Sequence, residues 1–223
     1  MMTREPHDQQ QIRSAAFTLL LGLVLMLAAG QTQAREVQAA TGLRATIHTA
    51  DEIRDRWLEG AGERRTLAHP AIGRLELAAA SPADTALVPV DADRVAAALS
   101  AVQGFEADLH VHVFLLPAMP EVVASSFARR DAIFMAPKFG RPADAPLAYE
   151  LIHELGHVLC WAAVDGRPDR WREYRDLRGL DPQPDPGRLP HAERNREIIA
   201  EDFRALFGGA VAANGGRIEN PRL

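Results

Sequence analysis

The chain has 223 residues, of which 47% are hydrophobic and 25% are charged. This length and this balance are typical of one globular domain with a sizeable core, and they argue against two large domains. The formal net charge of −5 at pH 7 provides no basic surface for a phosphate backbone, so we expect no nucleic-acid partner.

The N-terminal segment has the pattern of an export signal. An uncharged apolar run over residues 15–29 follows Arg4 and Arg13. Two small residues, Thr32 and Ala34, stand at the −3 and −1 positions of a cleavage site. The pattern therefore predicts cleavage after Ala34.

This prediction divides the chain into a signal peptide over residues 1–34 and a single domain over residues 35–223, which we expect in the periplasm or secreted. A membrane-spanning helix usually needs about 20 apolar residues, so the apolar run is short for one. If the segment is not cleaved, residues 15–30 would instead anchor the protein in a membrane. The chain's one cysteine, Cys160, cannot form an internal disulfide, so an exported fold has to rely on its core or on a metal.

Three regular elements are predicted before residue 120. Residues 51–62 have the pattern of a short amphipathic helix that ends in glycine. Residues 91–105 begin with an aspartate that can cap a helix, and their apolar residues recur on one helical face. In residues 109–117 apolar residues alternate with histidines before an apolar run, which predicts a strand. Residues 63–90 contain several prolines and have no pattern that we can assign. Further on, residues 129–137 predict a second strand, and a loop over residues 138–146 leads into a helix.

That helix carries LIHELGHVLC, residues 151–160, with two histidines four residues apart in an otherwise apolar segment. Residues at this spacing project from one helical face, so His153 and His157 can offer nitrogens to one metal ion. Glu154 lies beside that face, where a carboxylate can act as general base on a zinc-activated water without binding the metal. Because two buried histidines and a buried carboxylate are costly without a partner, the pattern favours a zinc site over a plain core helix.

A third metal ligand is predicted on a later helix over residues 197–209, which two glycines terminate. Glu197 is our candidate, and the small Ala200 on its face lets this helix approach the first one. Glu201, one turn further on, is expected to accept a hydrogen bond from the outer nitrogen of a ligand histidine. An ordinary solvated acidic face is the alternative. Other candidates for the ligand are Glu193, Glu201 and Asp202.

The two motifs together resemble those of the gluzincin metallopeptidases, in which two histidines and a glutamate bind zinc. HELGH at residues 153–157 followed by EIIAEDF at residues 197–203 is similar to the pattern of the anthrax lethal factor catalytic-domain type. The resemblance covers roughly residues 126–209. It implies one zinc per chain, zinc ligands at His153, His157 and Glu197, a general base at Glu154 and a supporting acceptor at Glu201.

The resemblance fails at one position. Members of this type have a tyrosine, proposed to assist the transition state, seven residues before the ligand glutamate, and this chain has Pro190 there. His191, the next residue, can donate a hydrogen bond to a developing oxyanion, and Tyr174 is a more distant alternative. If neither serves, catalysis would be slow or absent.

Other patterns give weaker indications. The metzincin pattern needs a glycine and a third histidine soon after the second, and HVLCWAAVDGR has neither in place. His110 and His112 face the same side of one strand, and we interpret them as structural or surface residues. Cys160 is interpreted as a small buried residue.

Two segments are candidates for substrate contacts. By the same resemblance, residues 129–137 are expected to form the sheet edge along which an extended peptide binds, the alternative being an ordinary strand. Residues 170–190 begin with a short helix and end in a proline-rich loop. Their place between the two ligand helices makes them a candidate wall or lid of the cleft.

These features predict an α+β fold of the zincin type: a small mixed β-sheet with helices, the HExxH helix, and then a mainly helical C-terminal part. The predicted function is an exported zinc-dependent metallopeptidase that hydrolyses a peptide or protein substrate. One alternative is an inactive binding or structural protein of peptidase-like fold, with structural zinc or none. Another is a zinc hydrolase that acts on something other than peptides.

Overall fold

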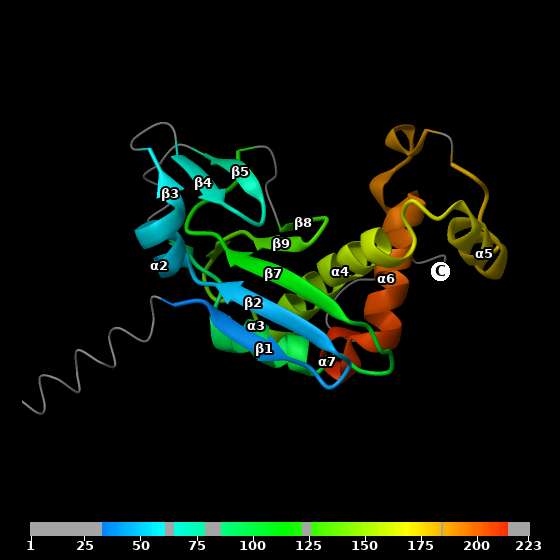
Figure 1. Cartoon of the computed structure of the whole chain (residues 1–223), viewed down its shortest axis with the longest axis horizontal. Coiled ribbons are helices and arrows are strands. Elements are labelled where there is room, and N and C mark those ends of the chain that lie inside the picture. The colour runs from blue at the N-terminus through cyan, green and yellow to red at the C-terminus, as the bar shows by residue number, and fades with distance from the viewer. Residues whose placement is uncertain (1–32, 61–64, 79–85, 122–125, 184, 214–223) are drawn as a thin grey trace, which may run out of the picture. The chain divides into compact units, whose positions relative to one another are not determined.

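The computed structural model describes residues 33–60, 65–78, 86–121, 126–183 and 185–213. The apolar run of the predicted signal peptide lies outside the described residues. The described residues combine helices with small sheets, which confirms the predicted α+β class (Figure 1). None of the helices in these ranges has both the length and the apolar composition to cross a membrane.

A five-stranded mixed sheet lies at the centre of the fold, with the strand order β1-β2-β7-β9-β8 (Figure 1). β7 pairs in parallel with both β2 and β9, whereas the neighbours β1-β2 and β8-β9 are antiparallel. The strands are Arg35–Gln38 (β1), Leu43–His48 (β2), Leu109–Leu115 (β7), Phe127–Arg129 (β8) and Ala132–Met135 (β9).

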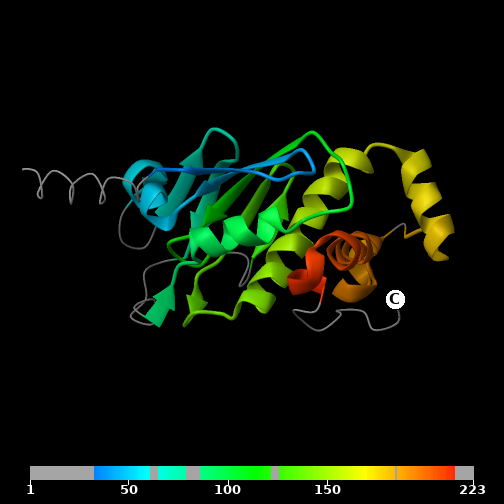
Figure 2. The same ribbon diagram turned by 90° about the horizontal axis from the view of Figure 1, so that it is seen from below.

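Helices α3 (Ala92–Ser100) and α4 (Asp144–Ala163) cover one face of this sheet (Figure 2). Alternate residues of β2 and β7 point toward them, and the apolar side of α4 completes this core. Leu151, Ile152 and Leu155 of α4 are all 0% exposed. Burial of each such side chain contributes roughly 1.5–3 kcal/mol, so the sheet holds α4 in one orientation.

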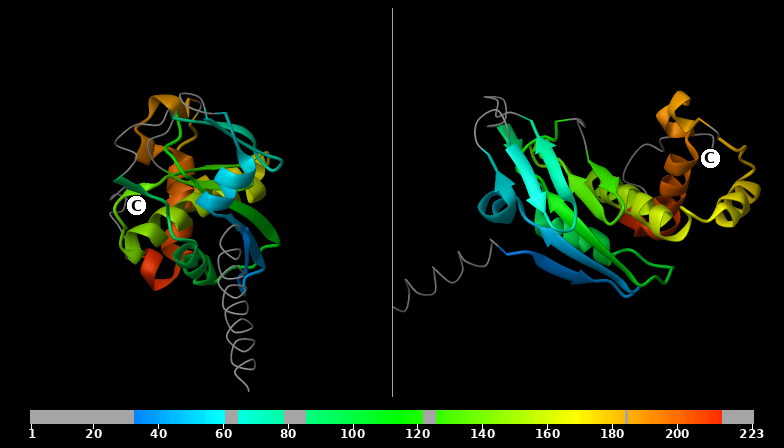
Figure 3. Two further views of the ribbon diagram at one scale, coloured as in Figure 1. Left: turned by 90° about the vertical axis from the view of Figure 1, so that its left-hand side faces the viewer. Right: turned by 45° about the horizontal axis from the view of Figure 1, so that its top comes forward.

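A small antiparallel sheet covers part of the opposite face (Figure 3). Its buried leucines pack against Phe114 and Phe134 of the central sheet. It is formed by β3 (Leu58–Glu59), β4 (Arg65–His69) and β5 (Gly73–Leu77), and a separate pair is formed by β6 (Leu87–Val88) and β10 (Lys138–Phe139). Strands β4, β5 and β6 therefore occupy the stretch that the sequence left unassigned.

The helix predicted over residues 51–62 is shorter in the structure. Helix α2 spans Ala50–Glu52 and continues as a π-helical turn over Ile53–Trp57. Thr49 begins α2, because its side chain accepts a hydrogen bond from the backbone N–H of Glu52. The chain then enters β3, where pairing with β4 replaces helical hydrogen bonds.

The strand predicted over residues 129–137 is divided in the structure. A turn at Arg130 and Asp131 separates β8 from β9, because polar residues there interrupt the apolar run. β9 is paired on both sides and β8 forms the edge. The prediction that residues 129–137 as a whole form the sheet edge was therefore wrong.

The described C-terminal part is mainly helical, as predicted. Helix α6 packs across α4 at a short distance: a Cβ on Gly156 would lie 2.7 Å from Cα of Ala200 and 2.8 Å from its carbonyl oxygen. Only glycine permits this approach, so Gly156 and Ala200 set the spacing at which the two helices present side chains to each other. The C-terminal helices are α5 (Pro168–Arg178), α6 (Asn195–Phe207) and α7 (Gly209–Ala213).

Candidate metal centre

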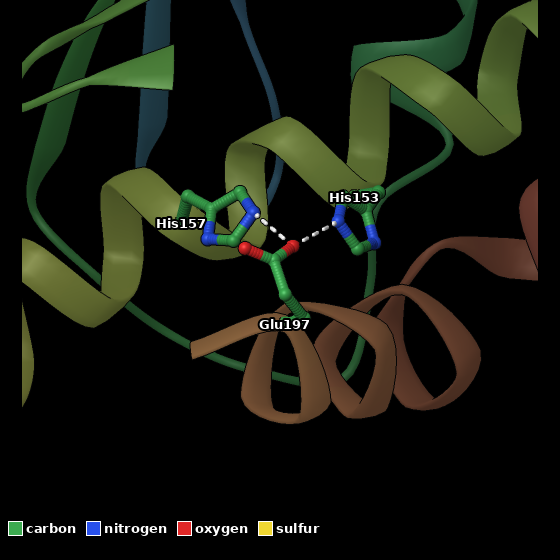
Figure 4. Close-up of side chains that lie close together, drawn as sticks. All are labelled: His153, His157 and Glu197. Carbon is green, nitrogen blue, oxygen red and sulfur yellow. Dashed lines mark hydrogen bonds and ion pairs between the residues drawn. The ribbon is translucent and has the colours of Figure 1, made fainter. Parts of the chain in front are cut away.

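The face of α4 that meets α6 carries both histidines of the HExxH motif (Figure 4). His153 is 8% exposed, and the ring centroids of His153 and His157 lie 4.9 Å apart. The one-turn spacing of the histidines therefore brings both rings to the same place, as the sequence predicted.

Glu197, in the first turn of α6, completes the group (Figure 4). Its Oε2 lies 3.3 Å from Nε2 of His153 and 3.1 Å from Nε2 of His157. One ligand atom from each of these three residues lies within 4.8 Å of the others, so the group could hold a metal ion. Within the described ranges it is the only such group of histidine, cysteine, aspartate or glutamate residues.

Glu201 supports this group from the next turn of α6. Its Oε2 lies 3.3 Å from Nδ1 of His153, the nitrogen that faces away from Glu197. Arg204 holds Glu201 with two hydrogen bonds, from Nε at 2.9 Å and from Nη2 at 2.6 Å. The hydroxyl of Tyr149 donates to the same carboxylate at 3.2 Å. Glu201 thus occupies the supporting position predicted for it, and its contacts orient the ring of His153.

The carboxylates determine the protonation of the cluster. Burial alone would lower the pKa of His153, but its hydrogen bonds to Glu197 and Glu201 outweigh burial and raise the pKa to about 9. Burial would raise the pKa of both glutamates, whereas the bonds to His153 hold it low, at about 2 for Glu201. The cluster therefore stabilises positive charge at its centre.

Glu154 lies next to the group without being part of it. It is 9% exposed, and burial raises its pKa against the opposing effect of His157 and His153. Within the described part of the chain, its carboxylate makes no hydrogen bond or ion pair, so its oxygens are available to accept a proton. A buried carboxylate with a raised pKa has the properties of a general base.

The two candidates for transition-state stabilisation differ in position. Nε2 of His191 lies 3.3 Å from Oε1 of Glu197, and the His191 side chain is 58% exposed. The hydroxyl of Tyr174 instead donates to Asp202 at 2.8 Å. The structure therefore brings His191, but not the Tyr174 hydroxyl, into contact with the metal group.

The remaining acidic candidates also lie apart from the group. Asp202 binds Tyr174 and an arginine, Arg178, at 2.8 Å, and Glu193 is exposed. The sequence missed the roles of Tyr149 and Arg204. A signal was present, since Tyr149 precedes His153 by four residues and Arg204 follows Glu201 by three, which places each pair on one helical face.

A cavity of about 410 Å³ opens beside Glu197. Its walls come from α5, from Gln183, Pro186 and Gly187, and from the start of α6. Residues 170–190 thus supply a wall of a hollow that reaches the metal group, as predicted, while their role as a lid stays a prediction. In Figure 1, α5 is the next helix after α4 along the chain, and it lies on the side of α4 where α6 packs.

Histidines and the cysteine outside the group have other surroundings. His110 bonds to Thr46 at 2.8 Å, and His112 lies 3.1 Å from His48 on the sheet face opposite α4. Cys160 is 2% exposed, and burial raises its pKa to about 12, so the thiol stays protonated.

Comparison with models of known protein families, with curated proteins and with solved structures finds no match to this chain. The function therefore has to be argued from the site itself.

Proposed function

We propose that the protein is a zinc-dependent metallopeptidase of the gluzincin type, with His153, His157 and Glu197 as zinc ligands. The observation that carries the proposal is the convergence of these three side chains from α4 and α6, beside a buried Glu154 that makes no hydrogen bond to any described residue. A structural site would have no need of that glutamate.

The donor set fits zinc. Two imidazole nitrogens and one carboxylate oxygen are a ligand set of catalytic zinc sites, which leave a fourth position open. A carboxylate on the outer nitrogen of a ligand histidine is the usual support for such a site, and Glu201 supplies it at 3.3 Å. When bound, zinc supplies Lewis acidity that activates water and polarises a carbonyl group.

The residues of the chain would divide the remaining work of peptide hydrolysis. Glu154 takes the proton from the attacking water and passes it to the amine that leaves. His191, exposed and next to Glu197, donates a hydrogen bond to the oxyanion that develops on the carbonyl. Arg204 and Tyr149 fix Glu201, which keeps the ring of His153 in position.

The test combines metal content with turnover in the Glu154→Gln variant. Wild type and variant should each contain about one zinc per chain after purification without chelator. The wild type should cleave a peptide mixture, and the variant should cleave it about a hundredfold or more slowly, because general-base catalysis contributes at least that factor to the rate.

Glu150→Gln is a matched control on the same helix, since Glu150 instead pairs with Lys138 at 2.6 Å. It should retain turnover. Unchanged hydrolysis in Glu154→Gln would remove Glu154 from the role of base. A protein that takes up no zinc when folded would contradict the whole proposal.

Two alternatives are separated by the same data. Pro190 in place of a tyrosine, together with the engagement of Tyr174 by Asp202, favours an inactive peptidase-like protein as second candidate. That protein would bind zinc, or none, and cleave no peptide. A zinc hydrolase with other substrates would lose a non-peptide activity in Glu154→Gln.

We further propose export to the periplasm or outside of the cell, which N-terminal sequencing of the mature protein would test.

A further inference from the structure

The cavity beside Glu197 has a positively charged wall. Three arginines line it. Arg175 belongs to α5, Arg194 is the residue just before α6, and Arg196 lies in the first turn of α6. Among the described lining residues, Glu197 is the one acid, and its carboxylate is directed at the histidines. The chain as a whole has a net charge of −5, so this local excess of positive charge is specific to the cavity.

The three arginines differ in their partners. Arg196 is neutralised by Asp165, with Nη2 and Oδ2 2.5 Å apart. Nε of Arg194 donates to a backbone carbonyl, that of Leu189, at 3.3 Å, and no carboxylate of the described residues pairs with its charge. The guanidinium of Arg175 makes no hydrogen bond or ion pair with any described residue, although the residue is partly buried. Arg175 and Arg194 therefore provide uncompensated positive charge at the cavity wall.

The start of α6 supplies a second, independent observation. Asn195 is 7% exposed, and its Oδ1 is buried without a hydrogen-bond partner among the described residues. Its Nδ2 donates to the backbone carbonyl of Asp181 at 3.3 Å, which orients the amide. A buried carbonyl oxygen without a donor is unfavourable, so the described residues leave the polar groups at the start of α6 incompletely paired. The positive end of the α6 dipole also lies at this wall, where it favours an anion.

We propose that this cavity binds a carboxylate of a peptide, with Arg175 as its principal contact and Arg194 as a second positive charge beside it. The identity of the ligand as a peptide rests on the metallopeptidase function proposed above. Because Glu197 belongs both to the cavity wall and to the metal group, the carboxylate would lie next to the bond to be cleaved. It is either the C-terminal carboxylate or the side chain of an aspartate or glutamate.

Binding, rather than turnover, is the measurement that tests this proposal. A random synthetic peptide mixture, with either a free or an amidated C-terminus, is passed over the immobilised Glu154→Gln protein in buffer with zinc. The retained peptides are sequenced by mass spectrometry. An acidic peptide here carries a carboxylate at its C-terminus or on an Asp or Glu side chain, and its neutral counterpart is the same peptide with an amidated C-terminus or with Asn or Gln at that position. Acidic peptides should be retained about tenfold over their neutral counterparts, as expected for a charge-assisted hydrogen bond. Loss of the preference on amidation would assign the C-terminal carboxylate, and its persistence at aspartate or glutamate would assign a side chain.

Two arginine variants of one helix make the test specific. Arg175→Gln should abolish the acidic preference while neutral peptides bind as before. Arg172→Gln removes the same charge from an exposed position of α5 outside the cavity lining and should keep the preference. Equal retention of acidic and neutral peptides, or a preference that survives Arg175→Gln, would overturn the proposal.

Cleavage of the same mixture by the wild-type protein is read separately. An acidic preference without cleavage would retain the carboxylate site and remove the peptidase function. Cleavage without any acidic preference would remove the carboxylate site and retain the peptidase function.

Discussion

Two groups of histidines lie on opposite sides of the central sheet, and they differ in what surrounds them. On the helical side, each ring faces carboxylates. On the other side, the rings lie against one another, with centroids 4.6–5.7 Å apart, and pack on Phe114, and among the described residues a single carboxylate, that of Glu52, contacts His48 at 3.3 Å. The α4–α6 cluster consists of His153, His157, Glu197 and Glu201, and the sheet cluster consists of His48, His69 and His112.

The pKa values of two buried rings show the effect of these surroundings. Burial lowers the pKa of both, but the carboxylates next to His153 outweigh it and raise that pKa to about 9. Burial and the neighbouring His112 lower the pKa of His48 to about 4. The same residue type thus favours positive charge in one cluster and excludes it in the other, and the neighbours decide which.

The comparison predicts that a metal ion distinguishes the two clusters, and this is the largest effect we expect. The wild type should bind about one zinc per chain, and Glu197→Ala should reduce this to near zero. At a zinc concentration of about 1,000 times the dissociation constant, the lost stabilisation is about 4 kcal/mol, visible as a lower Tm. Mass spectrometry of metal content and calorimetry with and without chelator measure both.

His48→Gln in the sheet cluster is the matched control and should keep its zinc. Full zinc content in Glu197→Ala would remove Glu197 from the role of metal ligand. Loss of zinc in His48→Gln would place the ion in the sheet cluster and reverse the comparison.

The sequence predicted the α4–α6 cluster but not the sheet cluster, for a physical reason. His153 and His157 are neighbours through helical spacing, and Glu197 is recognisable because a small residue, Ala200, shares its face. His48 and His69 belong to different sheets and meet only through tertiary packing, which no local pattern encodes.

The same distinction explains the errors in the fold. The position of β8 as sheet edge depends on pairing between distant segments, whereas the apolar run of residues 129–137 shows only that a strand is present. The short strands β4 and β5 lie in a proline-containing stretch, and β5 has exposed residues that weaken its apolar pattern. The existence of α3 and α4 was easier to predict, because apolar spacing indicates each helix and Asp91 caps α3. Their bounds were less well predicted: α3 ends at Ser100 rather than at residue 105, and α4 begins at Asp144, within the predicted loop.

Removal of Arg204 should lower the free energy of unfolding, because the α4–α6 cluster loses a buried ion pair. Arg204 is 1% exposed and binds both oxygens of Glu201, so Arg204→Met removes the two hydrogen bonds that this arginine makes to a buried carboxylate. Breaking a buried pair in this way costs about 3–5 kcal/mol. Arg170→Met, which removes an exposed pair with Glu173, should cost less than about 1 kcal/mol. Chemical denaturation would measure both, and equal losses would contradict a special role for Arg204.

A smaller effect is expected from altering the distance between the two ligand helices. Gly156→Ala places a methyl group 2.7 Å from the Ala200 backbone, so α6 has to move away from α4. We expect a loss of about 3 kcal/mol, at the upper end for overpacked sites, together with weaker zinc binding. Gly187→Ala, whose nearest contact would be a side-chain oxygen at 3.5 Å, should be nearly neutral. Normal zinc affinity in Gly156→Ala would show that the helix spacing does not control the metal group.

The smallest expected effect is a pH dependence that arises in the sheet cluster. The folded-state pKa of His48 is about 4, below the value near 6.5 of an unfolded chain, so between these values only the unfolded state binds the proton. Acidification therefore favours unfolding, by about 2 kcal/mol between pH 7 and pH 5, since one pKa unit corresponds to about 1.4 kcal/mol. Urea denaturation at both pH values measures this. His48→Gln, which cannot titrate, should reduce the acid sensitivity, and the remainder comes from His69 and His112, whose pKa values burial also lowers. The exposed His110 lies on the same sheet face, so His110→Gln should keep the acid sensitivity. An unchanged pH dependence in His48→Gln would mean that His48 is not the ring held neutral by its neighbours.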